Sequence, residues 1–392
     1  MKSKIIETVV ITFALVSCIT SKNEVRFEKD GSFYINATIN DSIQGRFVFD
    51  TGADGLYMDS TFISQHSSII KSKLDTARMR GAGATGYKQV LLVNDTVKVK
   101  AGNYIHKFTD SPILRLTDIN GENIAGIIGN EFIKNQAIEI DNDKLTLKIH
   151  SVVHRAKYES IIPFDYIDGR IYFNVDIEIR KNEFVKAKLL MDLGCSDAII
   201  LNSPYFQSFE DKVILPEKVI DYTILYGGAL GGNSNGGDFR SISIKLGDYN
   251  INDPIISFSK DTLGAFSKTN YDGLLGNEIL DRYNYAIDYK NQKLYLKKNS
   301  KSKKSFNSTL TGFYALKTQE NAIVMSIYYQ SEAYKNGLQL GDTIIAINNR
   351  KLDSLTDKEF YKELKTKGKI VKLTTIRNQK HIDIIFKLNY LL

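Results

Sequence analysis

The stretch Phe47-Val48-Phe49-Asp50-Thr51-Gly52-Ala53-Asp54 decides the fold of this chain. Its apolar residues predict a strand that runs into a hydrophobic core. A glycine two residues after Asp50 allows a tight loop that a Cβ atom would obstruct. The strand therefore delivers the Asp50 carboxylate to a place with little water, where an isolated charge is costly unless another group shares or uses it. By itself, an Asp-Thr-Gly tripeptide is more typical of an ordinary strand-to-turn corner.

The second half of the chain repeats the pattern. Lys188-Leu189-Leu190-Met191-Asp192-Leu193-Gly194 again joins an apolar strand to an aspartate, one further residue and a glycine. An apolar-apolar-Gly element follows each copy and opens at Gly126 in the first half and at Gly273 in the second. It begins 76 residues after Asp50 and 81 residues after Asp192. Two pairs of landmarks with nearly equal spacing indicate a duplicated lobe.

These residues resemble the active-site signatures of retropepsin-like and pepsin-like aspartic proteases. Asp50-Thr51-Gly52-Ala53-Asp54 is similar to the first signature, and Ile127-Ile128-Gly129 and Leu274-Leu275-Gly276 are similar to the second, which packs beneath the catalytic loop. As in pepsins, both aspartates lie on one chain. The resemblance covers about residues 31–298. It implies a mainly β, bilobal fold, with lobe one at residues 31–153 and lobe two at residues 154–298.

The resemblance implies that Asp50 and Asp192 form a catalytic pair. Two carboxylates within hydrogen-bonding reach cannot both ionise cheaply, so they share one proton over a wide pH range. The ionised partner takes a proton from a water held between them, the protonated partner hydrogen-bonds the peptide carbonyl, and water adds without a covalent intermediate. The residues expected to support the catalytic loops are Thr51, Gly52, Ala53, Leu193, Gly194 and Cys195.

Leu193 departs from the family pattern. A Thr or Ser normally follows each aspartate, and its hydroxyl braces the loops across the lobe boundary; Thr51 can do this, whereas Leu193 cannot. Losing such a hydrogen bond costs about 1 kcal/mol. That is too little to unfold a lobe, yet it loosens a site whose rate depends on placement within about 0.5 Å. Two interpretations therefore stay open, an active hydrolase and a lapsed one.

A glycine-rich run lies between the two signatures of lobe one, at residues 80–87. It lacks the Gly-Lys-Ser/Thr ending of a phosphate-binding loop. By position it resembles the flap hairpin that folds over substrate in aspartic proteases, with an ordinary loop as the alternative. Lobe two has a longer counterpart at residues 226–237, either a mobile loop near the cleft or a mere connection. The flap residues expected to bind substrate are Gly83, Ala84, Thr85, Gly86 and Tyr87.

The remaining reactive side chains indicate no second chemistry. His150 and His154 are four residues apart, but they lie where a strand end and a linker are predicted, with no acidic metalloprotease partner between them. No Ser/His/Asp or Cys/His arrangement accompanies Cys195, which we expect to be a small apolar filler. The sequence thus predicts no metal site and no cofactor.

The first 17 residues indicate export. Lys2 and Lys4 precede an apolar stretch that is too short to span a bilayer. Leu15-Val16-Ser17-Cys18 resembles the bacterial lipoprotein signal. The resemblance implies a signal peptide over residues 1–17, acylation of Cys18, a tether over residues 18–30 and a lipid anchor in the bacterial cell envelope. A cleaved signal with an incidental cysteine is the alternative.

The charge of the chain is weak ground for nucleic-acid binding. The net charge is +7, and five lysines lie together at residues 297–304. We interpret residues 299–311 as a solvated basic linker, because no basic stripe accompanies a recognisable nucleic-acid-binding fold. Attraction of this segment to an anionic membrane surface is a lesser alternative.

The pattern after the linker is that of a small α+β domain. A strand is predicted at residues 322–327, a helix with a glycine stop follows, and Gly341-Asp342 turns into a buried strand. Over residues 312–392 this resembles a bacterial PDZ domain, in which a peptide adds as a strand beside a helix. The resemblance places the carboxylate-binding turn at Gly312, Phe313, Tyr314 and Ala315.

These observations predict a monomeric, membrane-anchored aspartic endopeptidase. Its substrates would be peptides or unfolded proteins, and its PDZ domain would bind C-terminal peptides or regulate access. A peptide-binding lipoprotein that kept the protease fold and lost the reaction is the first alternative. A scaffold in which only the PDZ domain functions is the second.

Overall fold

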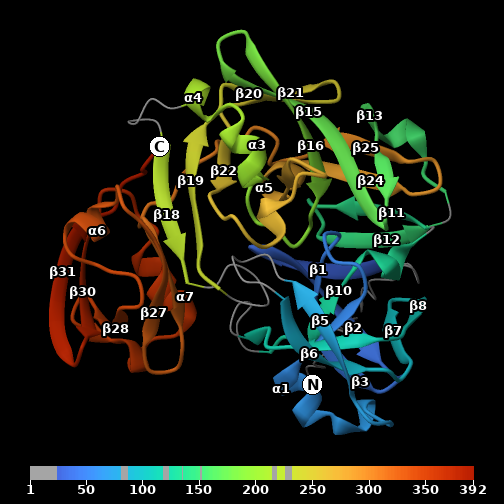
Figure 1. Cartoon of the computed structure of the whole chain (residues 1–392), viewed down its shortest axis with the longest axis horizontal. Coiled ribbons are helices and arrows are strands. Elements are labelled where there is room, and N and C mark those ends of the chain that lie inside the picture. Colours follow the sequence, from blue (N-terminus) through green and yellow to red (C-terminus); the bar gives the residue numbers. More distant parts are fainter. Residues whose placement is uncertain are drawn as a thin grey trace, which may run out of the picture.

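A computed structural model describes residues 24–80, 87–117, 123–134, 136–150, 152–213, 219–225 and 232–392. The chain is mainly β, as predicted, and forms two lobes and a C-terminal domain (Figure 1). In Figure 1 lobe one is blue to teal, lobe two runs from green to orange, and the C-terminal domain is red. No helix within these ranges has both the length and the apolarity needed to cross a membrane.

The described part of lobe one consists of short strands and a few short helical elements. Its strands are β1 (Glu24–Asp30), β2 (Ser32–Ile39), β3 (Ile43–Phe49), β4 (Leu56–Asp59), β5 (Asp75–Arg80), β6 (Tyr87–Val93), β7 (Val97–Ala101), β8 (Tyr104–Phe108), β9 (Ser111–Leu114), β10 (Gly126–Ile128), β11 (Ala137–Asp141) and β12 (Thr146–His150). Its helical elements are α1 (Ser60–Gln65), η1 (Ser67–Ile69) and η2 (Asn130–Ile133). Asp59 caps α1 by accepting from the N–H groups of Thr61 and Phe62.

Lobe two repeats this architecture. Its strands are β13 (Ser160–Pro163), β14 (Asp165–Ile167), β15 (Arg170–Arg180), β16 (Glu183–Met191), β17 (Ile199–Leu201), β18 (Val219–Ile224), β19 (Ser234–Arg240), β20 (Ser243–Leu246), β21 (Tyr249–Asn252), β22 (Ile255–Ser259), β23 (Gly273–Leu275), β24 (Tyr283–Asp288) and β25 (Lys293–Lys298). Its helical elements are η3 (Arg155–Lys157), α3 (Ser203–Gln207), α4 (Glu210–Val213), η5 (Ala265–Ser267) and α5 (Asn277–Leu280).

The predicted duplication is confirmed by the strand order. Lobe one pairs its strands in the order β3-β10-β4-β9-β6-β5, and lobe two in the order β16-β23-β17-β22-β19-β18. In each lobe the strand before the aspartate is parallel to the strand of the apolar-apolar-Gly element. The two halves of the chain therefore place their aspartates at equivalent points of one shared topology.

A sheet shared between the lobes joins them. Its strand order is β13-β25-β24-β11-β12-β1, and Ile138 of β11 lies opposite Ile287 of β24. Buried residues of both lobes form one continuous hydrophobic core. The predicted tether is wrong over residues 24–30, because these residues form β1, which pairs with β2 and β12 and buries Phe27.

The C-terminal domain has a hydrophobic core of its own. Thr356 caps α7 in a reciprocal capping box with Glu359. The elements of the domain are β26 (Phe313–Lys317), β27 (Ala322–Tyr328), α6 (Glu332–Lys335), β28 (Thr343–Ile347), β29 (Arg350–Lys351), η6 (Leu352–Ser354), α7 (Asp357–Glu363), β30 (Ile370–Arg377) and β31 (Lys380–Lys387).

The segment before this domain packs on lobe two, which corrects the expectation of a solvated linker. The Arg282 guanidinium lies 3.6 Å from the ring centre of Phe306 and donates to the carbonyl groups of Lys301 and Lys304. Phe306 itself is buried. Beyond this segment, β27 pairs with β18, so the sheet of the C-terminal domain continues the sheet of lobe two (Figure 1).

Candidate active site

Both aspartates stand at the end of a buried strand. Asp50 follows β3 and Asp192 follows β16. The backbone N–H of Asp50 donates to the carbonyl of Ile128, and that of Asp192 donates to the carbonyl of Leu275, each at 3.0 Å. The apolar-apolar-Gly strands thus hold the two aspartates from beneath, because both acceptors lie at the ends of those strands.

The two carboxyl groups converge from opposite lobes. Asp50 Oδ1 accepts from the N–H of Gly52 at 2.7 Å, and Asp192 Oδ1 accepts from the N–H of Gly194 at 2.7 Å. These matching bonds turn both side chains the same way relative to their loops. The two carboxyl groups lie within hydrogen-bonding reach of each other.

The close approach depends on the two loop glycines. A Cβ atom added at Gly52 would lie 2.8 Å from Asp192 Cγ, and one added at Gly194 would lie 2.7 Å from Asp50 Cγ. Side chains at these positions would occupy the space that the opposite carboxyl group fills. Each lobe therefore leaves room for the aspartate of the other.

Burial and mutual repulsion make the two aspartates unequal. Burial raises the pKa of Asp192 well above its ordinary value, and the negative charge of Asp50 and the hydrogen bond with it raise this pKa further. Burial also raises the pKa of Asp50, but hydrogen bonds from Asp192, Gly52, Ala53 and Gly194 oppose that rise. The two carboxyl groups therefore do not both ionise, and the pair shares one proton over a wide pH range.

Thr51 braces the loop of lobe two. Its hydroxyl donates to the carbonyl of Met191 at 2.8 Å and accepts from the N–H of Leu193 at 3.1 Å. Leu193 is fully buried in the core and has no hydroxyl with which to return this contact. Asn277 holds the same loop by donating to the carbonyl of Leu193 at 2.7 Å.

Two cross-lobe contacts were missed by the sequence reasoning. The Ser32 hydroxyl donates to the carbonyl of Gly194 at 3.1 Å, and Arg170 Nε donates to the carbonyl of Gly52 at 3.3 Å. Arg170 also forms an ion pair with Asp54 at 2.8 Å. The signal was present in the sequence, because Ser32 and Arg170 each follow a glycine at the start of the first long strand of their lobe.

Cys195 lies directly behind the Asp192 loop and is buried. Burial and the negative charges of Asp197 and Asp192 raise the pKa of its thiol well above the ordinary value. The group therefore stays protonated and packs beside Tyr172, Leu190 and Tyr271. Ala53, at the equivalent position of lobe one, donates its N–H to Asp50 Oδ1 at 3.2 Å.

Of the predicted flap, the structure describes Tyr87 and the flanking strands. Gly83, Ala84, Thr85 and Gly86 lie outside the described residues, as does Cys18. Tyr87 opens β6, is 63% exposed and lies 5.4 Å from the Arg78 guanidinium across the β5–β6 hairpin. The strands on both sides of the run are therefore those of a hairpin.

The predicted carboxylate-binding turn lies at the start of β26. Gly312 has φ +68°, and a Cβ atom there would lie 2.0 Å from Ser331 Cβ, so only glycine fits. Phe313 is buried in the domain core, whereas Tyr314 is exposed. The Ala315 carbonyl accepts from the Tyr361 hydroxyl of α7 at 3.0 Å, which places β26 beside this helix.

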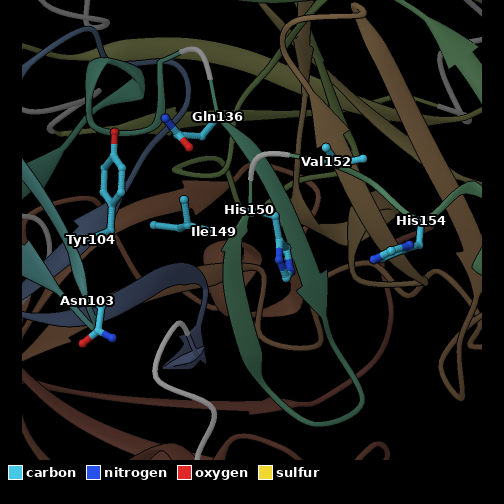
Figure 2. Close-up of a pocket in the computed structure, with 7 residues that line it drawn as sticks. All are labelled: Asn103, Tyr104, Gln136, Ile149, His150, Val152 and His154. Atoms are coloured by element: carbon cyan, nitrogen blue, oxygen red, sulfur yellow. The ribbon is translucent and has the colours of Figure 1, made fainter.

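A pocket of about 420 Å³ lies away from the aspartates, between β8 and the end of β12 (Figure 2). His150 and His154 line it, but their rings do not converge in Figure 2, and His150 lies 3.5 Å from Glu139. Within the described residues, no group of three or more His, Cys, Asp and Glu side chains could hold a metal ion. The pocket brings no reactive group to the carboxyl pair.

Two family models match the chain. Residues 35–132 match an aspartyl protease model, and residues 296–376 match a PDZ domain model. No curated protein matches it. The chain therefore carries an aspartyl protease domain followed by a C-terminal PDZ domain, as the sequence predicts. The first match contains Asp50 and ends in η2, and lobe two follows it with the same strand order.

Proposed function

We propose that the chain is an aspartic endopeptidase whose two lobes supply one catalytic aspartate each. The observation that carries this proposal is the convergence of Asp50 and Asp192, each held by the N–H of a loop glycine and close enough to share a proton. Because two adjacent buried carboxyl groups do not both ionise, the pair supplies one acid and one base at the same point. Peptides and unfolded proteins are the proposed substrates.

In the proposed reaction, Asp50 takes a proton from a water molecule as the water oxygen bonds to the scissile carbonyl carbon. Asp192 gives its proton to the carbonyl oxygen, which becomes a hydroxyl group. When the C–N bond breaks, Asp50 passes its proton to the departing nitrogen and Asp192 recovers one from the hydroxyl. Both carboxyl groups thereby return to their starting states.

The test is cleavage of an unfolded protein by the chain lacking residues 1–17. We expect Asp50→Asn and Asp192→Asn each to lower kcat by at least about 100-fold, because each removes one proton-transfer group. Glu139→Gln, which changes a carboxylate outside the pair, is the control. Unchanged cleavage by both asparagine variants would remove the pair from the mechanism.

A second candidate function is peptide binding without cleavage, and Leu193 is the observation that favours it. The hydroxyl contact expected there is replaced by a buried apolar side chain. Leu193→Thr separates the two candidates. An inert wild-type chain that this substitution activates would establish the binding protein, whereas an active wild-type chain would exclude it.

We further propose that Cys18 carries a lipid that anchors the protein in the bacterial cell envelope. The support is the sequence Leu15-Val16-Ser17-Cys18 after an apolar stretch. Expression of the full chain with Cys18→Ser should move the protein from the membrane fraction to the soluble fraction. Unchanged sedimentation would contradict the anchor.

A further inference from the structure

The lobe-two hairpin, formed by β18 and β19, has a partner that its lobe-one equivalent lacks. The strand order makes it the counterpart of the β5–β6 hairpin, since both end the series of strands in their lobe. Within the described residues, β5 has β6 as its only ladder partner, whereas β18 pairs with β19 on one side and with β27 of the PDZ domain on the other. The PDZ domain therefore occupies the outer edge of one hairpin of the pair.

The backbone contact is a regular antiparallel ladder. Thr223 lies opposite Ile327, and further bonds extend the ladder at both ends, from Leu225 N–H to the Met325 carbonyl at 2.8 Å and from Tyr329 N–H to the Asp221 carbonyl at 3.0 Å. A ladder fixes register as well as distance, because a one-residue slip would turn every side chain to the other face.

Three consecutive side chains at the end of β27 reinforce this ladder. The Tyr328 hydroxyl donates to Asp238 of β19 at 2.8 Å, and Gln330 Oε1 accepts from the Asp221 N–H at 3.0 Å. The Tyr329 hydroxyl shares a hydrogen bond with the Thr223 hydroxyl. Each of these three side chains forms its hydrogen bond with lobe two rather than with the PDZ domain.

The lobe-two hairpin is linked to the segment that follows Asp192 through Ser257 of β22, which lies opposite Asp238 of β19. The Tyr222 ring packs 5.1 Å from Tyr328. Burial raises the pKa of Tyr222, and the nearby negative charges of Asp238 and Asp197 raise it further. Ser257 lies within hydrogen-bonding reach of both Asp238 and Asp197, and Asp197 follows Asp192 by five residues. A series of side-chain contacts therefore links the PDZ domain, through this hairpin, to the loop that presents Asp192.

We propose that the PDZ domain is part of the active site's framework, with Tyr328, Tyr329 and Gln330 as positioning residues that hold the lobe-two hairpin against the Asp192 loop. This inference rests on the proposed endopeptidase. This role differs from substrate recruitment. A change in the framework should affect the cleavage of every substrate, including a peptide that is too short to enter a peptide-binding groove or whose C-terminal carboxylate is blocked.

The test uses the full chain after residue 17 with Tyr328→Phe, Tyr329→Phe and Gln330→Ala combined. Hydrogen exchange should become about 10-fold faster in β18 and β19, because hydrogen bonds on one edge are lost. Exchange in the β5–β6 hairpin should not change, and slow exchange in β30 and β31 would show that the PDZ domain is folded. Thr374→Ala, which removes the bond from Thr374 to Asp383 inside the PDZ domain, is the matched control.

Measurements of peptide cleavage then distinguish a framework role of the PDZ domain from a role in substrate recruitment. We expect kcat for an octapeptide with an amidated C-terminus to fall about 10-fold in the triple variant, with less change in KM, and to stay within twofold in Thr374→Ala. Normal kcat on the octapeptide, with loss only on long substrates, would overturn the framework role, as would unchanged exchange in β18 and β19. A wild-type chain that cleaves nothing would sink the proposed function, yet the exchange comparison, which needs no turnover, would still decide whether the PDZ domain holds this hairpin.

Discussion

The backbone N–H of Leu193 donates to the hydroxyl of Thr51 across the lobe boundary, at 3.1 Å. The same hydroxyl donates to the Met191 carbonyl, so one threonine of lobe one holds the backbone on both sides of Asp192. Leu193 gives lobe one no such support. Each aspartate loop is also held from the other lobe at a glycine carbonyl, Gly194 by Ser32 and Gly52 by Arg170, and Thr51 adds its two contacts to the Asp192 loop.

Thr51→Val should lower the free energy of unfolding by about 1–3 kcal/mol, because it leaves a buried N–H and a buried carbonyl without their partner. Urea denaturation monitored by tyrosine fluorescence measures the change. Thr38→Val, which removes the hydroxyl that accepts from Gln44 near the surface, should cost much less. An equal decrease in the free energy of unfolding in the two variants would show that the buried contact stabilises the protein no more than the surface contact does.

Gly52→Ala should abolish cleavage while the chain still folds. The added Cβ atom would meet Asp192 Cγ at 2.8 Å and push the carboxyl groups apart, and we expect kcat to fall by about 100-fold or more. Gly55→Ala is the matched control in the same loop, since the nearest atom to its Cβ would be Glu131 Oε2 at 3.8 Å. Activity retained by Gly52→Ala would mean that the two carboxyl groups need not approach each other.

Asp192→Asn should stabilise the protein at neutral pH. Because the folded pKa of Asp192 is raised, the stability linked to this group is complete below the ordinary pKa and is lost as the pH rises through the folded value. The substitution removes that loss, so Tm should rise at pH 7 and change little at pH 3.5. Calorimetry at the two pH values measures the difference.

In the control for this prediction, the expected change in Tm at pH 7 has the opposite sign. Backbone hydrogen bonds from Lys71 and Ser72 lower the pKa of the exposed Asp95 carboxylate. The stability linked to Asp95 is therefore present above its ordinary pKa and lost as the pH falls through the folded value. Asp95→Asn should lower Tm at pH 7, and a fall of Tm in both variants would contradict the burial argument for Asp192.

Arg170→Met should lower kcat by up to about fivefold, with little change in the free energy of unfolding. The ion pair with Asp54 lies near the surface and contributes at most about 1 kcal/mol, but Arg170 also holds the Gly52 carbonyl beside Asp50. Lys98→Met removes a similarly exposed ion pair, with Asp41, whose two residues lie outside both aspartate loops. Steady-state kinetics of the two variants should differ, and equal kcat values would leave Arg170 with no positioning role.

The repeated pattern with nearly equal spacing predicted the two lobes, and the resemblance to aspartic proteases implied that Asp50 meets Asp192. Resemblance to known families also located the strands beneath the loops and the PDZ domain. Such patterns are local, with apolar periodicity and loop glycines close together in the chain, and local order is what a single sequence records best.

Contacts between distant segments were beyond this reasoning. The pairing of Thr223 with Ile327 joins the edges of two strands that are far apart in the sequence. The sequence of an edge strand does not predict which other strand will pair with it. Residues 24–30 were misjudged for a related reason. Their charged residues suggested a tether, although Val25 and Phe27 alternate with them and are buried in the strand.

The sheet shared by β11 and β24 has a consequence for how the protein would behave on dilution. An enzyme assembled from two separate subunits loses its reactive centre as its concentration falls below the dissociation constant. Here four ladder pairs and a continuous peptide chain keep the halves together, so specific activity should be the same at nanomolar as at micromolar concentration.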